Sequence, residues 1–328
     1  MYTVTKNTKL TSLALMLIGV VALGYGFIQG AGHHTDEEIA HQVETIAHDL
    51  HLDVAHHVDA GHTHDAPAVE AHGHGHAVEA HYAPLFHKIE EVFHLHFSAE
   101  EMLEAHDVEH VIHSTIHALH AKGQRPWSSL LVAAIFFLGV SLVSIFFLAL
   151  QYVAEVGWTV VLKRVLMAIG SFLPYVGAVL LVIFITGGLH LFGNHTYHWM
   201  AIGIMDPESA NYDAIIAGKE AYLNFGFFML RAVIYLAGWY FGLKKLISLS
   251  LLEDKNGGLE YYNKSVKVAA IFIVFFAVTS SMMAWDWIMS IDTHWFSTLF
   301  GWYVFAGMMV TVFVVLSMVV VHLKSKGQ

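Results

Sequence analysis

Several ionisable side chains lie inside or beside long apolar runs, where a buried charge is usually paired or functional. Arg231 lies within the run that begins near residue 222, and Tyr235 follows one helical turn later. Asp286 ends the next apolar run. Placing a charge in lipid is expensive, so such residues are functional candidates by default. Arg231 could line a polar pathway or hold a carboxylate, and it could equally snorkel or cap carbonyls in a packed bundle.

The stretch from Trp285 to Thr298 is the most distinctive local sequence. It holds Asp286, Asp292 and His294 among three tryptophans and contains no basic residue. Tryptophan is enriched at membrane interfaces, and a carboxyl in low-dielectric surroundings suits proton exchange. The alternative is an aromatic belt on a tight turn, with the second aspartate capping the next helix. The spacing leaves both interpretations open.

Glu155, at the inner end of an earlier run, could open a proton entry, although an interfacial carboxylate is the simpler interpretation. We assign no catalytic, cofactor-binding or metal-binding residue. The candidates for a proton path are Arg231, Tyr235, Asp286, Asp292 and His294 toward the outside and Glu155 at the inner side.

Histidines are concentrated in one acidic segment. Residues 33–122 hold 21 of the 26 histidines, 17 of the 27 acidic residues and two lysines. Imidazoles aligned on one helix face could bind zinc, copper or nickel. So many interchangeable ligands instead favour a solvated segment that buffers protons and binds metal adventitiously. The histidines at three- and four-residue spacing, which share a helix face, are His106, His110, His113, His117 and His120.

The histidine-rich segment divides into two parts. Residues 33–82 are low in complexity, and we expect them to lack a packed core. Residues 84–122 are predicted to be helical, with Ser98 and Glu101 forming a capping box.

Six apolar runs are long enough to cross a hydrocarbon core of about 30 Å. Backbone in lipid must satisfy its hydrogen bonds internally, which predicts helices. We therefore expect an all-α, polytopic transmembrane bundle of about six spans with a periplasmic, histidine-rich, partly helical insertion. The runs lie near residues 10–29, 129–152, 165–188, 222–243, 266–285 and 298–322.

This pattern predicts three parts. Residues 1–30 form a first transmembrane helix, which we expect to be uncleaved because its apolar part is longer than that of a usual signal peptide. Residues 31–122 form the acidic segment, and residues 123–328 form a bundle of five helices. With the N-terminus inside, eleven basic residues lie on the inner side and four on the outer side. This bias predicts a cytoplasmic N-terminus and an acidic segment outside, which is the periplasm if the chain lies in a bacterial inner membrane.

The residues that are missing exclude several chemistries. The chain has no cysteine, which excludes thiolate-ligated iron–sulfur clusters, c-type haem attachment and disulfides. The predicted spans contain no paired histidine or aspartate ligands of the kind that moves a dehydrated cation through a membrane. A divalent metal-ion transporter or a metal-buffering membrane protein remains the alternative function.

Two motifs between residues 224 and 307 resemble a known family. They are Phe-Phe-Met-Leu-Arg231-Ala-Val-Ile-Tyr235 and Trp287-Ile-Met-Ser-Ile-Asp292-Thr-His294-Trp295-Phe-Ser-Thr-Leu-Phe-Gly301. This pattern is similar to the NrfD-like membrane subunits of bacterial alternative complex III, specifically to the ActF type called quinol:cytochrome c oxidoreductase quinone-binding subunit 2. Members of that family have more spanning helices than six, so we expect this chain to be truncated relative to them.

The resemblance implies a non-redox integral membrane subunit of a quinol:cytochrome c oxidoreductase, which scaffolds the membrane arm and conducts protons. The implied partners are a homologous ActC-like membrane subunit, an iron–sulfur subunit, multihaem and monohaem cytochrome c subunits, a terminal oxidase and lipid, but no nucleic acid. Iron–sulfur clusters and c-type haems would reside in those partners. Menaquinol or another quinol would bind in the neighbouring ActC-like subunit, and this chain would hold no cofactor.

Overall fold

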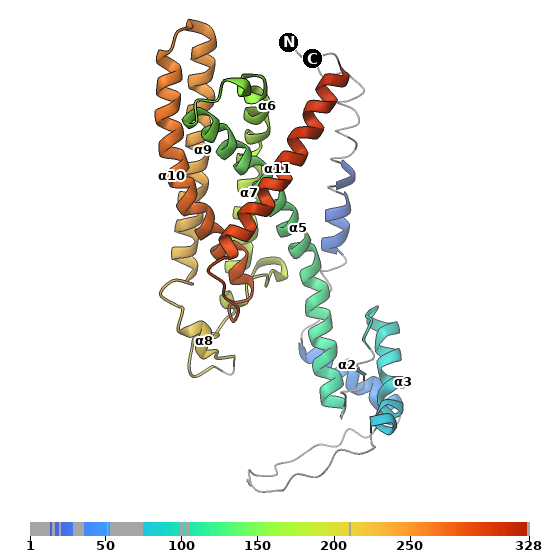
Figure 1. Cartoon of the computed structure of the whole chain (residues 1–328). Coiled ribbons are helices and arrows are strands. Elements are labelled where there is room, and N and C mark those ends of the chain that lie inside the picture. Colours follow the sequence, from blue (N-terminus) through green and yellow to red (C-terminus); the bar gives the residue numbers. More distant parts are fainter. Residues whose placement is uncertain are drawn as a thin grey trace. The chain divides into compact units, whose positions relative to one another are not determined.

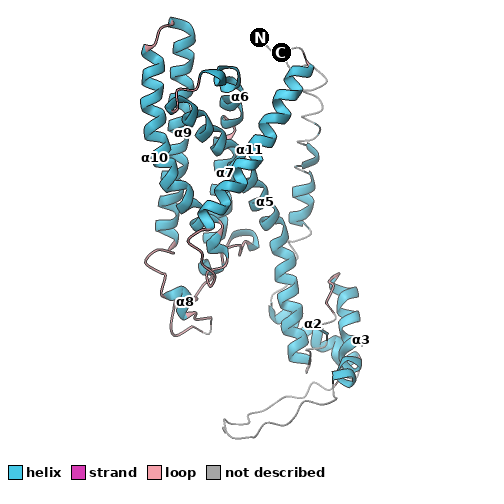
Figure 2. Ribbon diagram, viewed as in Figure 1, coloured by secondary structure: helices cyan, strands magenta, loops and turns pink. Residues whose placement is uncertain are grey.

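The computed structural model describes residues 14, 17–19, 21–28, 36–50, 52, 75–98, 101–102, 105, 107–209 and 211–326. This part of the chain is helical and contains no strand (Figure 2). The chain divides into two compact units, Met1–Pro126 and Trp127–Gln328. The all-α prediction is therefore confirmed for the described residues.

The helices in chain order (Figure 1) are α2 (Asp36–Asp49), α3 (Gly75–Phe93), α5 (Val108–Val153), α6 (Val160–Gly170), α7 (Leu173–Gly188), α8 (Ala214–Ala217), α9 (Phe225–Asn256), α10 (Glu260–Trp287) and α11 (Phe300–Ser325), with short 3₁₀ turns η1 (Gly157–Thr159), η2 (Leu191–Gly193), η3 (His198–Met200) and η4 (Met289–Ile291).

Five helical segments in the described chain are long and apolar enough to cross a membrane. They comprise α5, the α6–α7 pair, α9, α10 and α11. Large apolar side chains such as Val161, Ile271 and Phe313 point outward from them, as lipid-facing residues do. These features are consistent with a multi-pass membrane protein. Of the first predicted span, residues 14, 17–19 and 21–28 are helical, and the remainder lies outside the described residues.

The predicted run 165–188 is not one continuous helix. It is interrupted after Gly170, and α7 begins at Leu173 with Pro174 in its first turn. Proline lacks an N–H and fits the start of a helix, where no carbonyl is available to receive one. A break between two helices therefore precedes this proline.

Helices α9 and α10 form an antiparallel hairpin and lie side by side (Figure 1). The side chain of Asn224 caps α9 by accepting the Phe227 N–H at 2.9 Å. The hairpin turns at Gly257 and Gly258, whose φ angles of 70° and 77° favour glycine. Because the two helices run in opposite directions, the first turns of α9 lie beside the last turns of α10.

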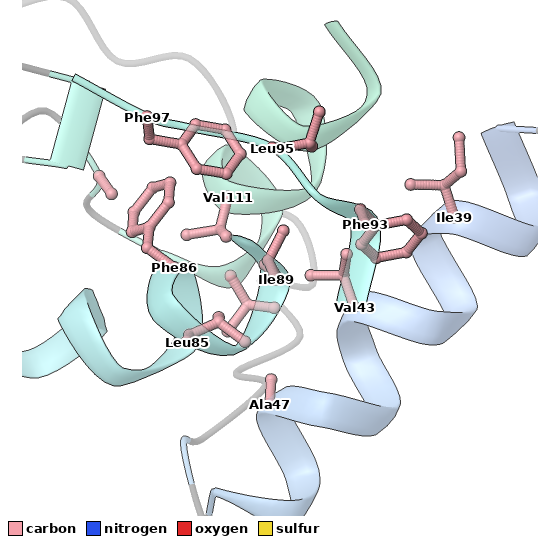
Figure 3. Close-up of a cluster of buried hydrophobic side chains, with 12 residues drawn as sticks. Ile39, Val43, Ala47, Leu85, Phe86, Ile89, Phe93, Leu95, Phe97 and Val111 are labelled. Carbon is pink, nitrogen blue, oxygen red and sulfur yellow. The ribbon is translucent and has the colours of Figure 1, made fainter. Parts of the chain in front are cut away.

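The unit Met1–Pro126 has a core of its own (Figure 3). The expectation that residues 33–82 lack a packed core is wrong for α2, because its apolar face packs against α3. The reason is that the apolar residues of α2 recur at helical spacing, although the segment as a whole is polar and rich in histidine. The predicted capping box is present, since Glu101 accepts the Ser98 N–H at 2.7 Å and the Glu101 N–H reaches the Ser98 hydroxyl at 3.2 Å. The buried residues are Ile39, Val43, Ala47, Leu85, Phe86, Ile89, Phe93, Leu95, Phe97, Ala105, Val108 and Val111.

The histidine row lies largely on α5. His113, His117 and His120 are exposed, and His110 is partly so. The opposite face of this helix is buried at Val111. His106 and most of residues 51–74 lie outside the described residues.

Candidate functional site

The hairpin brings Arg231 of α9 and Asp286 of α10 into direct contact. The Arg231 Nε donates to Asp286 Oδ2 at 2.8 Å, and Nη2 donates to Oδ1 at 3.1 Å. Arg231 lies in the second turn of α9 and Asp286 at the end of α10. Two parallel N–H···O bonds of this kind match the planar guanidinium to the carboxylate and are stronger than neutral hydrogen bonds. The carboxylate that Arg231 holds is therefore that of Asp286, from the tryptophan-rich stretch Trp285 to Thr298.

Two further hydrogen bonds hold the pair. The Tyr235 hydroxyl donates to Asp286 Oδ2 at 3.1 Å, and the Arg231 Nη1 donates to the Tyr222 carbonyl at 3.1 Å. The guanidinium carbon lies 4.0 Å from the centre of the Tyr222 ring and 4.3 Å from that of Phe227. Aromatic faces attract such a cation. Both charges are thus fixed in position by several independent contacts.

The pair is deeply buried. Arg231 is 4% exposed and Asp286 is 0% exposed. Removing one partner from such a pair strands an uncompensated charge, which costs about 3–5 kcal/mol. Sequence alone predicted the functional candidates, and the fold joins three of them, Arg231, Tyr235 and Asp286, in one buried cluster.

Aromatic side chains surround the pair on the protein side. Trp287 lies next to Asp286, with its ring centre 6.0 Å from that of Tyr235 and 5.9 Å from that of Trp239. The Tyr197 hydroxyl donates to the Trp287 carbonyl at 2.8 Å. This shell excludes water and lowers the local dielectric constant, which strengthens the electrostatic interactions inside it.

A pocket with a volume of about 420 Å³ is lined by residues that contact the pair, but not by Arg231 or Asp286. Its lining includes Tyr222, whose ring faces Arg231, and Ser290, whose hydroxyl donates to the Asp286 carbonyl. Asp292 and Lys219 also line it. The pocket therefore connects Asp292 with the residues that contact the buried pair.

His294 and Asp292 lie outside the buried cluster. The His294 Nε2 is 2.7 Å from Oδ2 of Asp213, and Asp292 Oδ1 accepts the His294 N–H at 3.1 Å. The alternative that Asp292 caps the next helix is wrong, because α11 begins at Phe300 without a side-chain cap. Its carboxylate instead closes the turn in its own loop.

Asp213 was not among the predicted residues. Its carboxylate caps α8 by accepting the N–H groups of Ile215 at 2.8 Å and Ile216 at 3.1 Å. The Ile216 N–H lowers the pKa of Asp213 most, burial has the next largest effect and raises it, and the Ile215 N–H and His294 lower it further, so that the pKa is lowered overall. The Asp–Ala–Ile–Ile sequence carries only a weak capping signal. The contact between Asp213 and His294 could not be predicted, because the two residues are 81 positions apart.

Glu155 lies at the opposite end of the hairpin region from the buried pair. It is exposed, follows α5, and has a φ of 51°. The ion pairs near that end are instead Lys163 with Glu253, at 2.7 Å, and Arg164 with Asp254. The adjacent doublets Lys-Arg and Glu-Asp were the available signal for these pairs.

The described part of the chain is helical, is consistent with a multi-pass membrane protein, and has a buried, hydrogen-bonded ion pair at one end of a helical hairpin. Within the described residues, no group of three or more His, Cys, Asp or Glu side chains could hold a metal ion. No protein-family profile matches the chain, and no curated protein matches its sequence.

Proposed function

We propose that this chain is a non-redox integral membrane subunit of a quinol-oxidising complex of the alternative complex III type, and that it holds the membrane arm together and conducts protons. The observation that carries the proposal is the buried cluster of Arg231, Asp286 and Tyr235. In a bundle of apolar helices, a carboxylate held ready beside a phenol and a guanidinium is suited to charge transfer.

The proposal involves two charge states of Asp286, and the neutral one leaves the guanidinium without its counter-charge, at a cost of about 3–5 kcal/mol. When Asp286 is ionised, it receives three hydrogen bonds from Arg231 and Tyr235. A proton that arrives through the adjacent pocket would neutralise the carboxylate and weaken its attraction to the guanidinium. The Tyr222 carbonyl and the rings of Tyr222 and Phe227 would then still hold the arginine. The site can therefore take up and release a proton without losing its arginine.

Polar groups continue along the hairpin toward its other end. The Trp239 indole N–H donates to the Thr279 hydroxyl at 2.9 Å, one turn beyond Tyr235. From Arg231 to Glu253, α9 rises about 33 Å. The buried pair and the Lys163–Glu253 pair therefore lie toward opposite ends of the hairpin. The basic-residue bias favours the end with Lys163 as the cytoplasmic one.

Partner subunits would supply the redox centres. The resemblance supports an ActC-like membrane subunit that holds the quinol site, an iron–sulfur subunit and c-type cytochromes. A chain without cysteine needs such partners to take part in electron transfer.

The proposal is tested by purification in mild detergent followed by a visible absorption spectrum. Co-purification with multihaem cytochrome would give a red preparation with c-type absorption bands. The complex is then reconstituted in vesicles, and Asp286→Asn is compared with the exposed control Glu208→Gln. Quinol-linked proton release should fall in the first variant alone, at equal haem content. A colourless, single-subunit preparation would contradict the complex, and equal proton stoichiometry would contradict the proton path.

The exposed histidines of α5 favour metal buffering over transport, because they lie outside the apolar spans. Metal buffering predicts that the chain alone binds zinc. Zinc binding should fall when His113 and His117 are both replaced by Ala.

A further inference from the structure

A groove along the outer surface of the hairpin combines apolar walls with two cationic side chains. It has a volume of about 660 Å³ and is lined by α9 and α10. Sites for small molecules commonly have volumes of about 300–1,000 Å³. Its apolar lining includes Phe241, Ile271 and Phe275, and its polar lining is Lys244, Lys245 and Ser248.

The polar lining lies at one end of the groove. Phe241, Lys244, Lys245 and Ser248 share one face of α9, since they are three, four and seven residues apart. From Phe225 to Lys244 the helix rises about 29 Å, so the lysines lie about one hydrocarbon thickness from its start. This places both ammonium groups at the level of lipid headgroups, with the apolar part of the groove extending toward the membrane centre.

Neighbouring charges leave these two lysines available. Lys163, Arg164 and Lys264 pair with acidic residues at this end of the bundle. No acidic residue lines the groove. Lys244 and Lys245 are both exposed, and the Lys244 ammonium lies 5.9 Å from the centre of the Tyr240 ring.

The groove is not a vacant helix-docking site. Gly238 and Gly242 have the small-xxx-small spacing that brings transmembrane helices together. In this structure, the rings of Phe275 and Phe272 already occupy the space above them. A further helix would meet aromatic rings and a pair of like charges here, whereas a flexible acyl chain can follow such a surface.

We infer that this groove binds an anionic phospholipid of the surrounding bilayer, with its phosphate at Lys244 and Lys245 and an acyl chain along Phe241 and Ile271. Each lysine near a membrane surface contributes about 1 kcal/mol to the attraction of anionic lipid. Loss of both charges should therefore weaken binding about 30-fold.

The test uses the full chain, or its complex, in detergent with phosphatidylglycerol or phosphatidylcholine as the probe, and native mass spectrometry counts bound lipid. The double variant K244Q/K245Q should bind phosphatidylglycerol about 30-fold more weakly. The matched control K255Q/K324Q removes two lysines outside the groove and should bind it as the natural chain does. Equal loss in both variants, or no loss in the first, would overturn the site.

A second arm identifies the occupant directly. A photo-crosslinking amino acid at Phe241, an exposed position, should attach to phosphatidylglycerol in vesicles that contain it. A bulky side chain in Ile271→Trp should reduce this product several-fold without altering the unfolding temperature, since Ile271 is 73% exposed. Crosslinking to a polypeptide in place of lipid would show that a protein covers the groove and would refute the inference.

Discussion

Arg231 and Asp286 stabilise the fold only when both are present, because each was taken out of water to contact the other. Together with Tyr235 they form a set in which every charged group has a partner. At the scale of single residues, variants that remove one or all of these groups can therefore distinguish a role in stability from a role in proton transfer.

Asp286→Asn should lower the free energy of unfolding by about 3–5 kcal/mol, because the guanidinium stays buried without its counter-charge. The triple variant R231M/Y235F/D286L should regain most of that loss, since it buries neither a charge nor an unpaired hydroxyl. Thermal unfolding in detergent, followed by tryptophan fluorescence, measures both. If the triple variant is the less stable of the two, the pair stabilises the fold beyond its own desolvation cost. If the triple variant is stable, it should still fail to release protons.

The loop segment around Asp213, whose carboxylate contacts His294, should become less stable at low pH. The pKa of Asp213 is lowered in the folded chain, so its contribution to stability is present above the ordinary aspartate pKa of about 3.9 and is lost as the pH falls through the lowered folded value. Amide exchange of Ile215 and Ile216, corrected for its intrinsic pH dependence, should therefore accelerate only as the pH falls below the ordinary aspartate pKa of about 3.9. In Asp213→Asn the corrected rates should be high at every pH; a preserved acid transition in that variant would assign the effect to another group.

At the scale of elements, the α9–α10 hairpin depends on close helix contact as much as on hydrophobicity. Gly238 and Gly242 admit the rings of Phe275 and Phe272, and this contact keeps the two helices in the register that joins Arg231 to Asp286. A larger residue at either glycine would displace a phenylalanine ring. We expect this displacement to disturb the register of α9 against α10.

Gly238→Ala should destabilise the chain by about 1–3 kcal/mol, because the added methyl group overpacks the contact with Phe275. The control is Gly307→Ala in α11, where nothing lies within 4 Å of the added carbon. Alanine is the better helix former, so that change should be neutral or stabilising by up to about 1 kcal/mol. Unfolding temperatures in one detergent compare the two. Equal effects would show that Gly238 matters only through helix propensity.

At the scale of the whole molecule, two compact units have separate cores. Phe86→Ala removes a fully buried ring from the unit Met1–Pro126 and should cost that unit about 3–5 kcal/mol. Hydrogen–deuterium exchange with peptide resolution should show faster exchange in α2 and α3, while the α9–α10 hairpin keeps its natural rates. Faster exchange in that hairpin would show that the two units unfold together.

The apolar runs determined the helical class and the approximate places of α9, α10 and α11, since backbone in lipid has few alternatives to a helix. The expense of burying a charge was enough to single out Arg231 and Asp286 as candidates. Sequence could not determine that they bind each other, because they are 55 residues apart and the contact depends on the register of the hairpin. Only the tertiary structure showed that Asp213 contacts His294 and that Asp292 and Glu155 are exposed. It also showed that Ile39 and Val43, from a histidine-rich segment, pack into a core. Composition reports how much apolar surface a chain has, whereas only packing decides which side chains meet.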